Sequence, residues 1–191
     1  MKFSFSSFYL TTARGLTLAR LGSILPFLII LIQTDREGPY FWGPSLLILY
    51  VFIVLSDFLD GLLARKAGAP SLFWGHVDAA VDIAFNTLSL STVAWLGRVG
   101  PWVPGGVAFL GGRCILRNLR PRPALQGRLD EDGAGKAAGV FYYLLVGAIV
   151  LELSLEGEDG RWLIDRAGDA VFIYTLFVLQ RRDRAVNLSG F

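Results

Sequence analysis

The feature that most constrains the fold is a series of six apolar stretches, each close in length to a membrane-spanning helix. They cover roughly residues 17–33, 43–65, 74–97, 100–118, 137–153 and 162–181. A helix needs about 20 predominantly apolar residues to cross a bilayer. The apolar residues come in blocks and do not alternate as they would in β-barrel strands. The sequence therefore predicts an all-α integral membrane protein with six transmembrane helices, forming a single domain over residues 1–191.

Turn-forming segments separate these stretches. Glycine and proline cluster at residues 35–39, 67–70, 100–106, 120–135 and 156–160. Residues 3–13 mix Phe and Tyr with Ser and Thr, which predicts a short interfacial segment before the first span. No small-residue cleavage site follows a short apolar core, so no cleaved signal peptide is expected. The single cysteine, Cys114, excludes an intramolecular disulfide and a cysteine-rich metal site.

The distribution of basic residues predicts the orientation in the membrane. If the amino terminus is cytosolic, most of the 18 Lys and Arg residues lie at cytosolic helix ends, and the opposite face keeps Arg36, Arg98, Arg161 and Arg166. This asymmetry obeys the positive-inside rule with both termini cytosolic. Tryptophans near the proposed outer boundary would form an aromatic belt, namely Trp42, Trp95, Trp102 and Trp162. Because topology accounts for the basic residues, nucleic-acid binding has no support.

Four aspartates lie in two of the apolar stretches, at the ends predicted to be cytosolic. Asp57 and Asp60 are three residues apart, and Asp78 and Asp82 are four apart. On helices, both spacings place the pair on one face. An ionisable residue within a membrane span is costly and is by default a functional hypothesis. If the two helices are antiparallel neighbours, the two pairs face one another.

Metal binding is the simplest way to keep four carboxylates ionised at that depth. Two divalent cations would balance their charge, and a set of oxygen ligands favours Mg²⁺ or Mn²⁺ over zinc. His76 is the only histidine and is better explained as a polar residue at a helix end. Two neighbouring metal ions suit phosphoryl transfer, in which a carboxylate can also act as general base. The alternatives are ion pairs with the arginines, a proton relay, or a small cation carrier, although no inverted repeat supports a carrier.

The spacing of these residues matches a pattern found in one family of membrane enzymes. The pattern is D-x-x-D-G-x-x-A-R, eight residues, then G-x-x-x-D-x-x-x-D, and it is matched at Asp57, Asp60, Gly61, Ala64, Arg65, Asp78 and Asp82. The chain thus resembles the CDP-alcohol phosphotransferases of phospholipid synthesis. It departs at the second glycine, where Trp74 stands and Gly75 follows one residue later. Leu16-Thr-Leu-Ala-Arg20 and Gly135-Lys136 are also similar to family segments.

The resemblance implies a reaction and a role for each matched residue. The phosphatidyl group of CDP-diacylglycerol would pass to the hydroxyl of a small alcohol, releasing CMP, at a site facing the cytoplasm of a bacterial or archaeal-type membrane. The four aspartates would hold two metals, and Asp82 would also be the general base. The CDP moiety would be bound by Asp57, Gly61, Ala64, Arg65, Gly75 and Asp78. A homodimer is implied, and Trp74 keeps a non-catalytic, degenerate family member open as an alternative.

A basic trio bears on the choice of acceptor. Arg113 and Arg117 share a helical face at the predicted cytosolic end of the fourth span, and Lys136 opens the fifth. They would suit a phosphorylated acceptor, or else serve topology and contacts with anionic lipid. Our best prediction is glycerol 3-phosphate, as in a phosphatidylglycerophosphate synthase-like enzyme, with inositol phosphate or an unphosphorylated alcohol as alternatives. In the last span, Asp169 is spaced to pair with Arg166.

Overall fold

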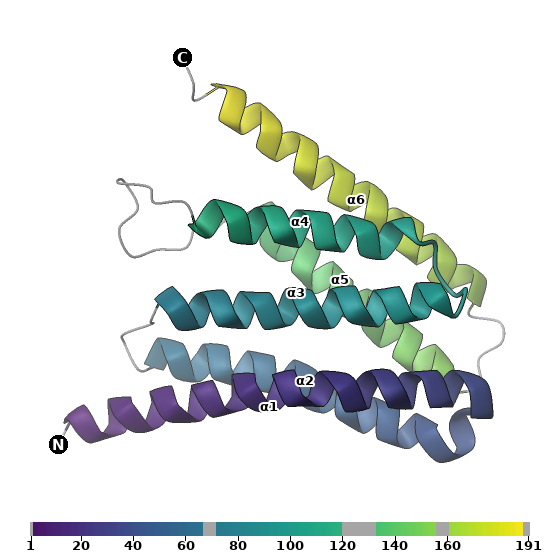
Figure 1. Ribbon diagram of the computed structural model, residues 1–191, viewed down its shortest axis with the longest axis horizontal. Coiled ribbons are helices and arrows are strands. Elements are labelled where there is room, and N and C mark those ends of the chain that lie inside the picture. Colours follow the sequence, from purple (N-terminus) through teal and green to yellow (C-terminus); the bar gives the residue numbers. More distant parts are fainter. Residues whose placement is uncertain (1, 67–71, 120–132, 156–160, 189–191) are drawn as a thin grey trace. The chain divides into compact units, whose positions relative to one another are not determined.

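The described part of the chain folds into helices, as Figure 1 shows for the computed structural model. The structure describes residues 2–66, 72–119, 133–155 and 161–188. The helices are α1 (Lys2–Glu37), α2 (Pro39–Lys66), α3 (Leu72–Trp95), α4 (Trp102–Leu119), α5 (Gly133–Ser154) and α6 (Arg161–Leu188). No strand occurs among the described residues. The predicted all-helical class is therefore confirmed.

Within the described residues, three helices are long and apolar enough to cross a membrane. These segments are Phe8–Glu37 of α1, Pro39–Leu63 of α2 and Ala137–Ser154 of α5. The apolar part of α4, Trp102–Leu116, is shorter. Residues 3–13, predicted as a short interfacial segment, form the first turns of α1, which is one helix of 36 residues; their place at the interface stays a prediction. Pro26 lies inside α1, a position that membrane helices tolerate.

The turn between α1 and α2 follows from its sequence. Gly38 has φ 90°, a left-handed conformation that favours glycine, and its N–H donates to the Thr34 carbonyl at 3.1 Å. Pro39 then begins α2, where its missing N–H costs no helical hydrogen bond. The chain reverses here, so α1 and α2 pack side by side and antiparallel (Figure 1).

The helices fall into two compact units, and the first contains the predicted aspartates. It comprises α1, α2, the residues of α3 up to Phe85, and the end of α5 from Leu153. One stripe of α1 faces its core, at the helical spacing of three and four residues: Ala13, Thr17, Arg20, Ile24, Phe27, Leu31 and Thr34. The Phe27 ring lies 5.2 Å from that of Phe85 between ring centroids. Ser154 donates to the Gly43 carbonyl at 3.1 Å, which fixes the end of α5 against α2.

The second unit comprises the rest of α3, α4, α5 up to Glu152, and α6. Helices α4 and α6 pack closely where α4 has a glycine, because a Cβ at Gly106 would lie 2.9 Å from Cδ2 of Phe172. Arg98 donates both hydrogen bonds of an ion pair from one guanidinium nitrogen to Glu152, at 2.9 and 2.8 Å. Asp169 accepts a hydrogen bond from the Trp102 indole at 3.0 Å. Its partner is therefore Trp102, and the pairing with Arg166 suggested by their spacing is not among the described interactions.

Candidate active site

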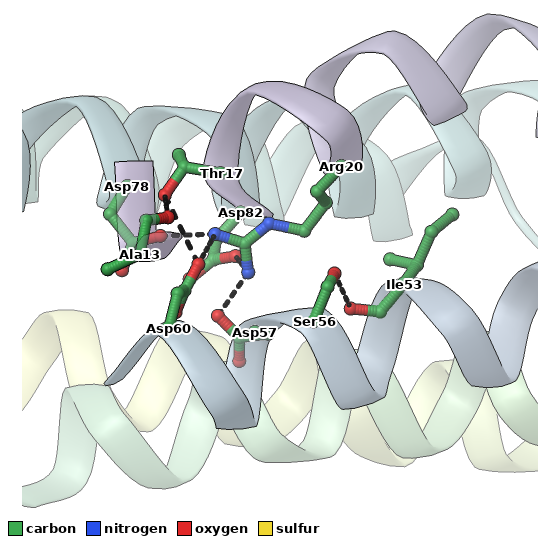
Figure 2. Close-up of polar contacts among 9 residues, drawn as sticks. All are labelled: Ala13, Thr17, Arg20, Ile53, Ser56, Asp57, Asp60, Asp78 and Asp82. Carbon is green, nitrogen blue, oxygen red and sulfur yellow. Dashed lines mark hydrogen bonds and ion pairs between the residues drawn. The ribbon is translucent and has the colours of Figure 1, made fainter. Parts of the chain in front are cut away.

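The four predicted aspartates come together in the first unit. Asp57 and Asp60 project from the last turns of α2, and Asp78 and Asp82 from the first turns of α3. Figure 2 shows both pairs pointing toward one another, with an arginine of α1, Arg20, between them. The spacings of three and four residues place each pair on one helix face. The prediction that the two pairs face one another is confirmed by these shared contacts.

Arg20 contacts all four aspartates at once. Its Nη1 pairs with Asp57 and, at 2.9 Å, with Oδ1 of Asp82. Its Nη2 pairs with Asp78 and, at 3.3 Å, with Oδ2 of Asp60. The Arg20 side chain is 0% exposed, which would be very costly for a guanidinium without such partners. Each terminal nitrogen thus joins one aspartate of α2 to one of α3.

Asp60 is the most deeply buried of the four aspartates, with 4% of its side chain exposed. Its Oδ2 accepts hydrogen bonds from Arg20 and, at 3.2 Å, from the hydroxyl of Thr17, one turn before Arg20 on α1. Its Oδ1 is buried and has no hydrogen-bond partner. A buried carboxylate oxygen without a partner carries a desolvation cost, and a bound cation would offset it.

Three of the aspartates have the spacing of a metal site. One carboxylate oxygen from each of Asp57, Asp60 and Asp78 lies within 4.8 Å of the other two. Asp57 and Asp78 are 34% and 36% exposed, so a ligand has access to them that it lacks at Arg20. Asp82, 30% exposed, joins the cluster through Arg20 and is not one of this triad.

The residues present fit a divalent cation. If all four carboxylates are ionised, Arg20 leaves the cluster with a formal charge of about −3. The oxygen ligands are those that Mg²⁺ and Mn²⁺ prefer. The partnerless Oδ1 of Asp60 is the observation that favours a cation over a closed network of ion pairs. Asp57, Asp60 and Asp78 are the residues placed to hold it.

The residues predicted to bind CDP lie beside this cluster on the same two helices. Gly61 follows Asp60, and a Cβ there would meet only Nη1 of Arg65, at 3.9 Å, so the helix surface at Gly61 is open. Arg65 is exposed one turn further along α2. Ala64 belongs to α2, but its side chain lies outside the described residues. Gly75 is half-buried in the first turn of α3.

Trp74, which replaces the expected glycine, stacks on an arginine of α1. The guanidinium carbon of Arg14 lies 5.1 Å from the centre of the Trp74 ring. Arg14 is one turn before Thr17, and Trp74 is one turn before Asp78. The Arg14–Trp74 pair therefore lies next to the carboxylate cluster, toward the helix ends where α1 and α3 begin.

The predicted acceptor residues are in the other unit. Arg113 is half-buried on α4, with its guanidinium carbon 6.0 Å from the centre of the Phe109 ring. Arg117 on α4 and Lys136 on α5 have side chains outside the described residues. Because the aspartates belong to the first unit and this trio to the second, the role of the trio stays a prediction.

Sequence reasoning missed the two residues of α1 in the cluster. From the sequence alone, Thr17 and Arg20 stand out only as part of Leu16-Thr-Leu-Ala-Arg20, which is similar to a family segment. The signal that points to them is an arginine that directly precedes a long uncharged run, residues 21–34, with a threonine three residues earlier. A buried positive charge on that face requires negative partners, and the aspartates are the available ones.

Comparison with known proteins agrees with this geometry. The model of the CDP-alcohol phosphatidyltransferase family matches residues 10–180. The matched region contains the whole carboxylate cluster, Thr17 and Arg20, and it covers helices of both units. Neither the comparison with curated proteins nor that with solved structures finds a match.

Proposed function

The chain belongs to the CDP-alcohol phosphatidyltransferase family, and we propose that it transfers the phosphatidyl group of CDP-diacylglycerol to the hydroxyl of a small alcohol, releasing CMP. Members of this family are phosphotransferases, so the protein is an enzyme. The observation that best supports the specific reaction is the meeting of two aspartate pairs, from α2 and α3, around one point. Such a cluster suits a reaction centre in which carboxylates hold cations, and the cations would in turn bind the negative phosphate oxygens.

Two divalent cations, Mg²⁺ or Mn²⁺, are the proposed cofactors. Asp57, Asp60 and Asp78 are the first ligands, because their oxygens lie within 4.8 Å of one another, and Asp82 completes the set. When bound, the cations neutralise phosphate charge and stabilise the attacking and leaving oxygens. Asp60 anchors the set, since Thr17 and Arg20 fix its other oxygen.

Asp82 is the proposed general base. Its side chain is 30% exposed and lies outside the compact triad, so an acceptor hydroxyl can approach it. Asp82 accepts the proton of the acceptor hydroxyl as that oxygen forms a bond to the lipid-bearing phosphorus. The bond from this phosphorus to the CMP oxygen breaks, and CMP leaves with the electron pair.

The proposed nucleotide site is the open face of α2 together with the start of α3. Gly61 leaves the helix surface accessible, and with Ala64 it would let the CDP moiety approach the backbone. Arg65 is exposed beside Gly61 and would pair with the diphosphate. Asp57, Gly75 and Asp78 complete the proposed contacts.

Glycerol 3-phosphate is the proposed acceptor, with inositol phosphate and unphosphorylated alcohols as alternatives. Its phosphate would be held by Arg113, Arg117 and Lys136. Half-burial of Arg113 is compatible with this role, because a guanidinium at that depth benefits from an anionic partner.

The proposed setting is a multi-pass membrane protein, active as a homodimer, with the reaction centre at the cytoplasmic side. All six helices would cross the bilayer, as one domain with both termini cytosolic. Three helices meet the length and apolarity of a span, and the charge distribution along the chain supports the remaining crossings.

The test is CMP release by the purified protein in liposomes containing CDP-diacylglycerol. Acceptors are added one at a time with Mg²⁺ or Mn²⁺, and a chelator removes the metal in a parallel reaction. We expect release with one acceptor, its loss with chelator, and a decrease of about 10²–10⁴-fold in Asp82→Asn, the usual contribution of a general base. Arg36→Gln, an exposed change at the other end of α1, is the control.

The outcome also separates the proposed enzyme from a degenerate family member. The observation behind this second candidate, a non-catalytic family member, is Trp74. Its large ring, stacked on Arg14, stands where the family pattern has glycine. Binding of metal and CDP-diacylglycerol without CMP release, for every acceptor tried, would contradict the proposed reaction and favour a binding role.

A further inference from the structure

Arg20 has a position that the family pattern of aspartates does not explain. It is fully buried on α1, and its guanidinium lies at the point toward which the four carboxylates converge (Figure 2). The same carboxylates are the proposed metal ligands. Any cation bound by Asp57, Asp60 and Asp78 therefore shares its ligands with a positive charge that belongs to the protein.

The shape of the guanidinium matters as well as its charge. Nη1 joins Asp57 of α2 to Asp82 of α3, and Nη2 joins Asp60 of α2 to Asp78 of α3. A planar fork can make both links at once, whereas the ammonium of a lysine is a single point charge. Arg20 thus holds the two helices in register across the cluster.

The cluster is left with both a charge and an oxygen available to a further cation. The single positive charge of Arg20 balances only one of the four negative charges of the carboxylates. In addition, Oδ1 of Asp60 has no hydrogen-bond partner. Thr17 and Arg20 both contact Oδ2 of Asp60, which turns Oδ1 away from them. The carboxylates are therefore held in position, while part of their negative charge and one of their oxygens remain without a partner.

We propose that Arg20 is an internal counter-cation, a positioning residue that holds the four carboxylates in a metal-ligating arrangement and lowers their affinity for divalent cations. Like charges at such distances repel strongly where water is scarce. The affinity is thereby set below the value that four free carboxylates would give. This inference rests on the proposed metal site.

The experiment measures metal affinity without turnover. The melting temperature of the full chain in detergent is followed as Mg²⁺ is raised, and the concentration at half-maximal stabilisation is the readout. Without Mg²⁺, we expect Arg20→Gln to melt at a lower temperature than the wild type, because the carboxylates repel one another. We also expect the Mg²⁺ concentration at half-maximal stabilisation to fall on the order of tenfold or more in this variant. Arg20→Lys keeps the charge and should stay within about threefold of the wild-type midpoint. Because it loses the planar fork that links α2 to α3, it should still melt at a lower temperature than the wild type without Mg²⁺.

The controls separate this inference from the metal site itself. Arg36→Gln makes the same charge change on the same helix at an exposed position and should leave the midpoint unchanged. A midpoint in Arg20→Gln equal to or above that of the wild type overturns the inference. No stabilisation of the wild type by either Mg²⁺ or Mn²⁺ removes the proposed metal site and the inference together.

A measurement on the wild-type protein covers the case in which Arg20→Gln does not fold. With ¹⁵N-labelled arginine, the Nε–H signal of Arg20, identified by its loss in Arg20→Lys, is followed during the Mg²⁺ titration. If the chemical shift of this signal changes and is half-complete at the Mg²⁺ concentration of the melting midpoint, the guanidinium shares its ligands with the ion. A signal that stays fixed while Mg²⁺ saturates the protein contradicts the proposal.

Discussion

At the scale of single residues, Trp74 is the position at which this chain differs from its family pattern. Its ring stacks on the Arg14 guanidinium, one helical turn from Asp78. Such a contact contributes about 0.5–1 kcal/mol at an exposed site. It also fills space beside the proposed nucleotide site, which glycine would leave open. We therefore expect the ring to stabilise the first unit and to narrow the approach to the proposed nucleotide site.

Replacing Trp74 by glycine tests this interpretation. We expect the KM for CDP-diacylglycerol to fall by about two- to tenfold, because the approach widens while the reacting groups stay in place. The free energy of unfolding should fall by about 1–2 kcal/mol, from the lost stacking and from glycine within a helix. Initial rates of CMP release and thermal melting provide both values.

Trp74→Ala is the matched comparison, since it removes the ring without making the backbone more flexible. It should show the same decrease in KM with a smaller loss of stability. A higher KM in both variants would mean that the ring provides a surface for the nucleotide and does not restrict its entry.

The residue scale also shows why the sequence predicted only part of the cluster. Asp57, Asp60, Asp78 and Asp82 were predictable, because their spacing on two neighbouring helices leaves few alternatives for four charges in apolar segments. Arg20 was not, because an arginine near the cytosolic end of a span is also what topology requires. Only the packing of α1 against α2 and α3 shows that this arginine faces inward.

At the scale of helices, the contact between α4 and α6 depends on one of two adjacent glycines. A Cβ at Gly106 would lie 2.9 and 3.1 Å from two ring carbons of Phe172, whereas a Cβ at Gly105 would meet nothing within 4 Å. Small residues at helix interfaces in membranes allow backbones to approach closely. Gly106 is therefore a packing residue, and Gly105 is not.

These two glycines give a matched pair of substitutions. Gly106→Ala should lower the free energy of unfolding by about 1–3 kcal/mol, the usual cost of overpacking, while Gly105→Ala should be neutral or slightly stabilising. Thermal melting in detergent measures both. Equal melting temperatures for the two variants would show that α6 can move away from α4 at little cost.

The sequence predicted the helices better than it predicted their ends. Gly38 and Pro39 separate α1 from α2 as expected, because both residues are strong turn formers. The interfacial segment predicted over residues 3–13 is continuous with α1, because Ser and Thr are compatible with a helix when their hydroxyls bond to it, as Thr12 does to the Phe8 carbonyl at 2.9 Å. Polar composition alone therefore did not mark a boundary.

At the scale of the whole molecule, the number of crossings decides whether the two termini lie on the same side of the membrane. Only segments of α1, α2 and α5 meet the criteria of a span among the described residues. The remaining helices carry charges, such as Asp78 and Asp82 on α3 and Asp165, Arg166 and Asp169 on α6. Those of α3 pair with Arg20, so a criterion based on mean hydropathy underestimates the ability of this helix to cross.

Two fusions distinguish six crossings from three. With the amino terminus cytosolic, six crossings place a reporter fused after Arg98, behind α3, on the outer side and one fused to the carboxyl terminus in the cytosol. If only α1, α2 and α5 cross, both reporters change sides, because two crossings precede Arg98 and three precede the carboxyl terminus.

We expect the pattern of six crossings, measured in a bacterial host with one reporter that is active only outside the cytosol and one that fluoresces only within it. The second pattern would place α3 along the membrane surface, and the aspartate cluster would then have to form without a transmembrane α3.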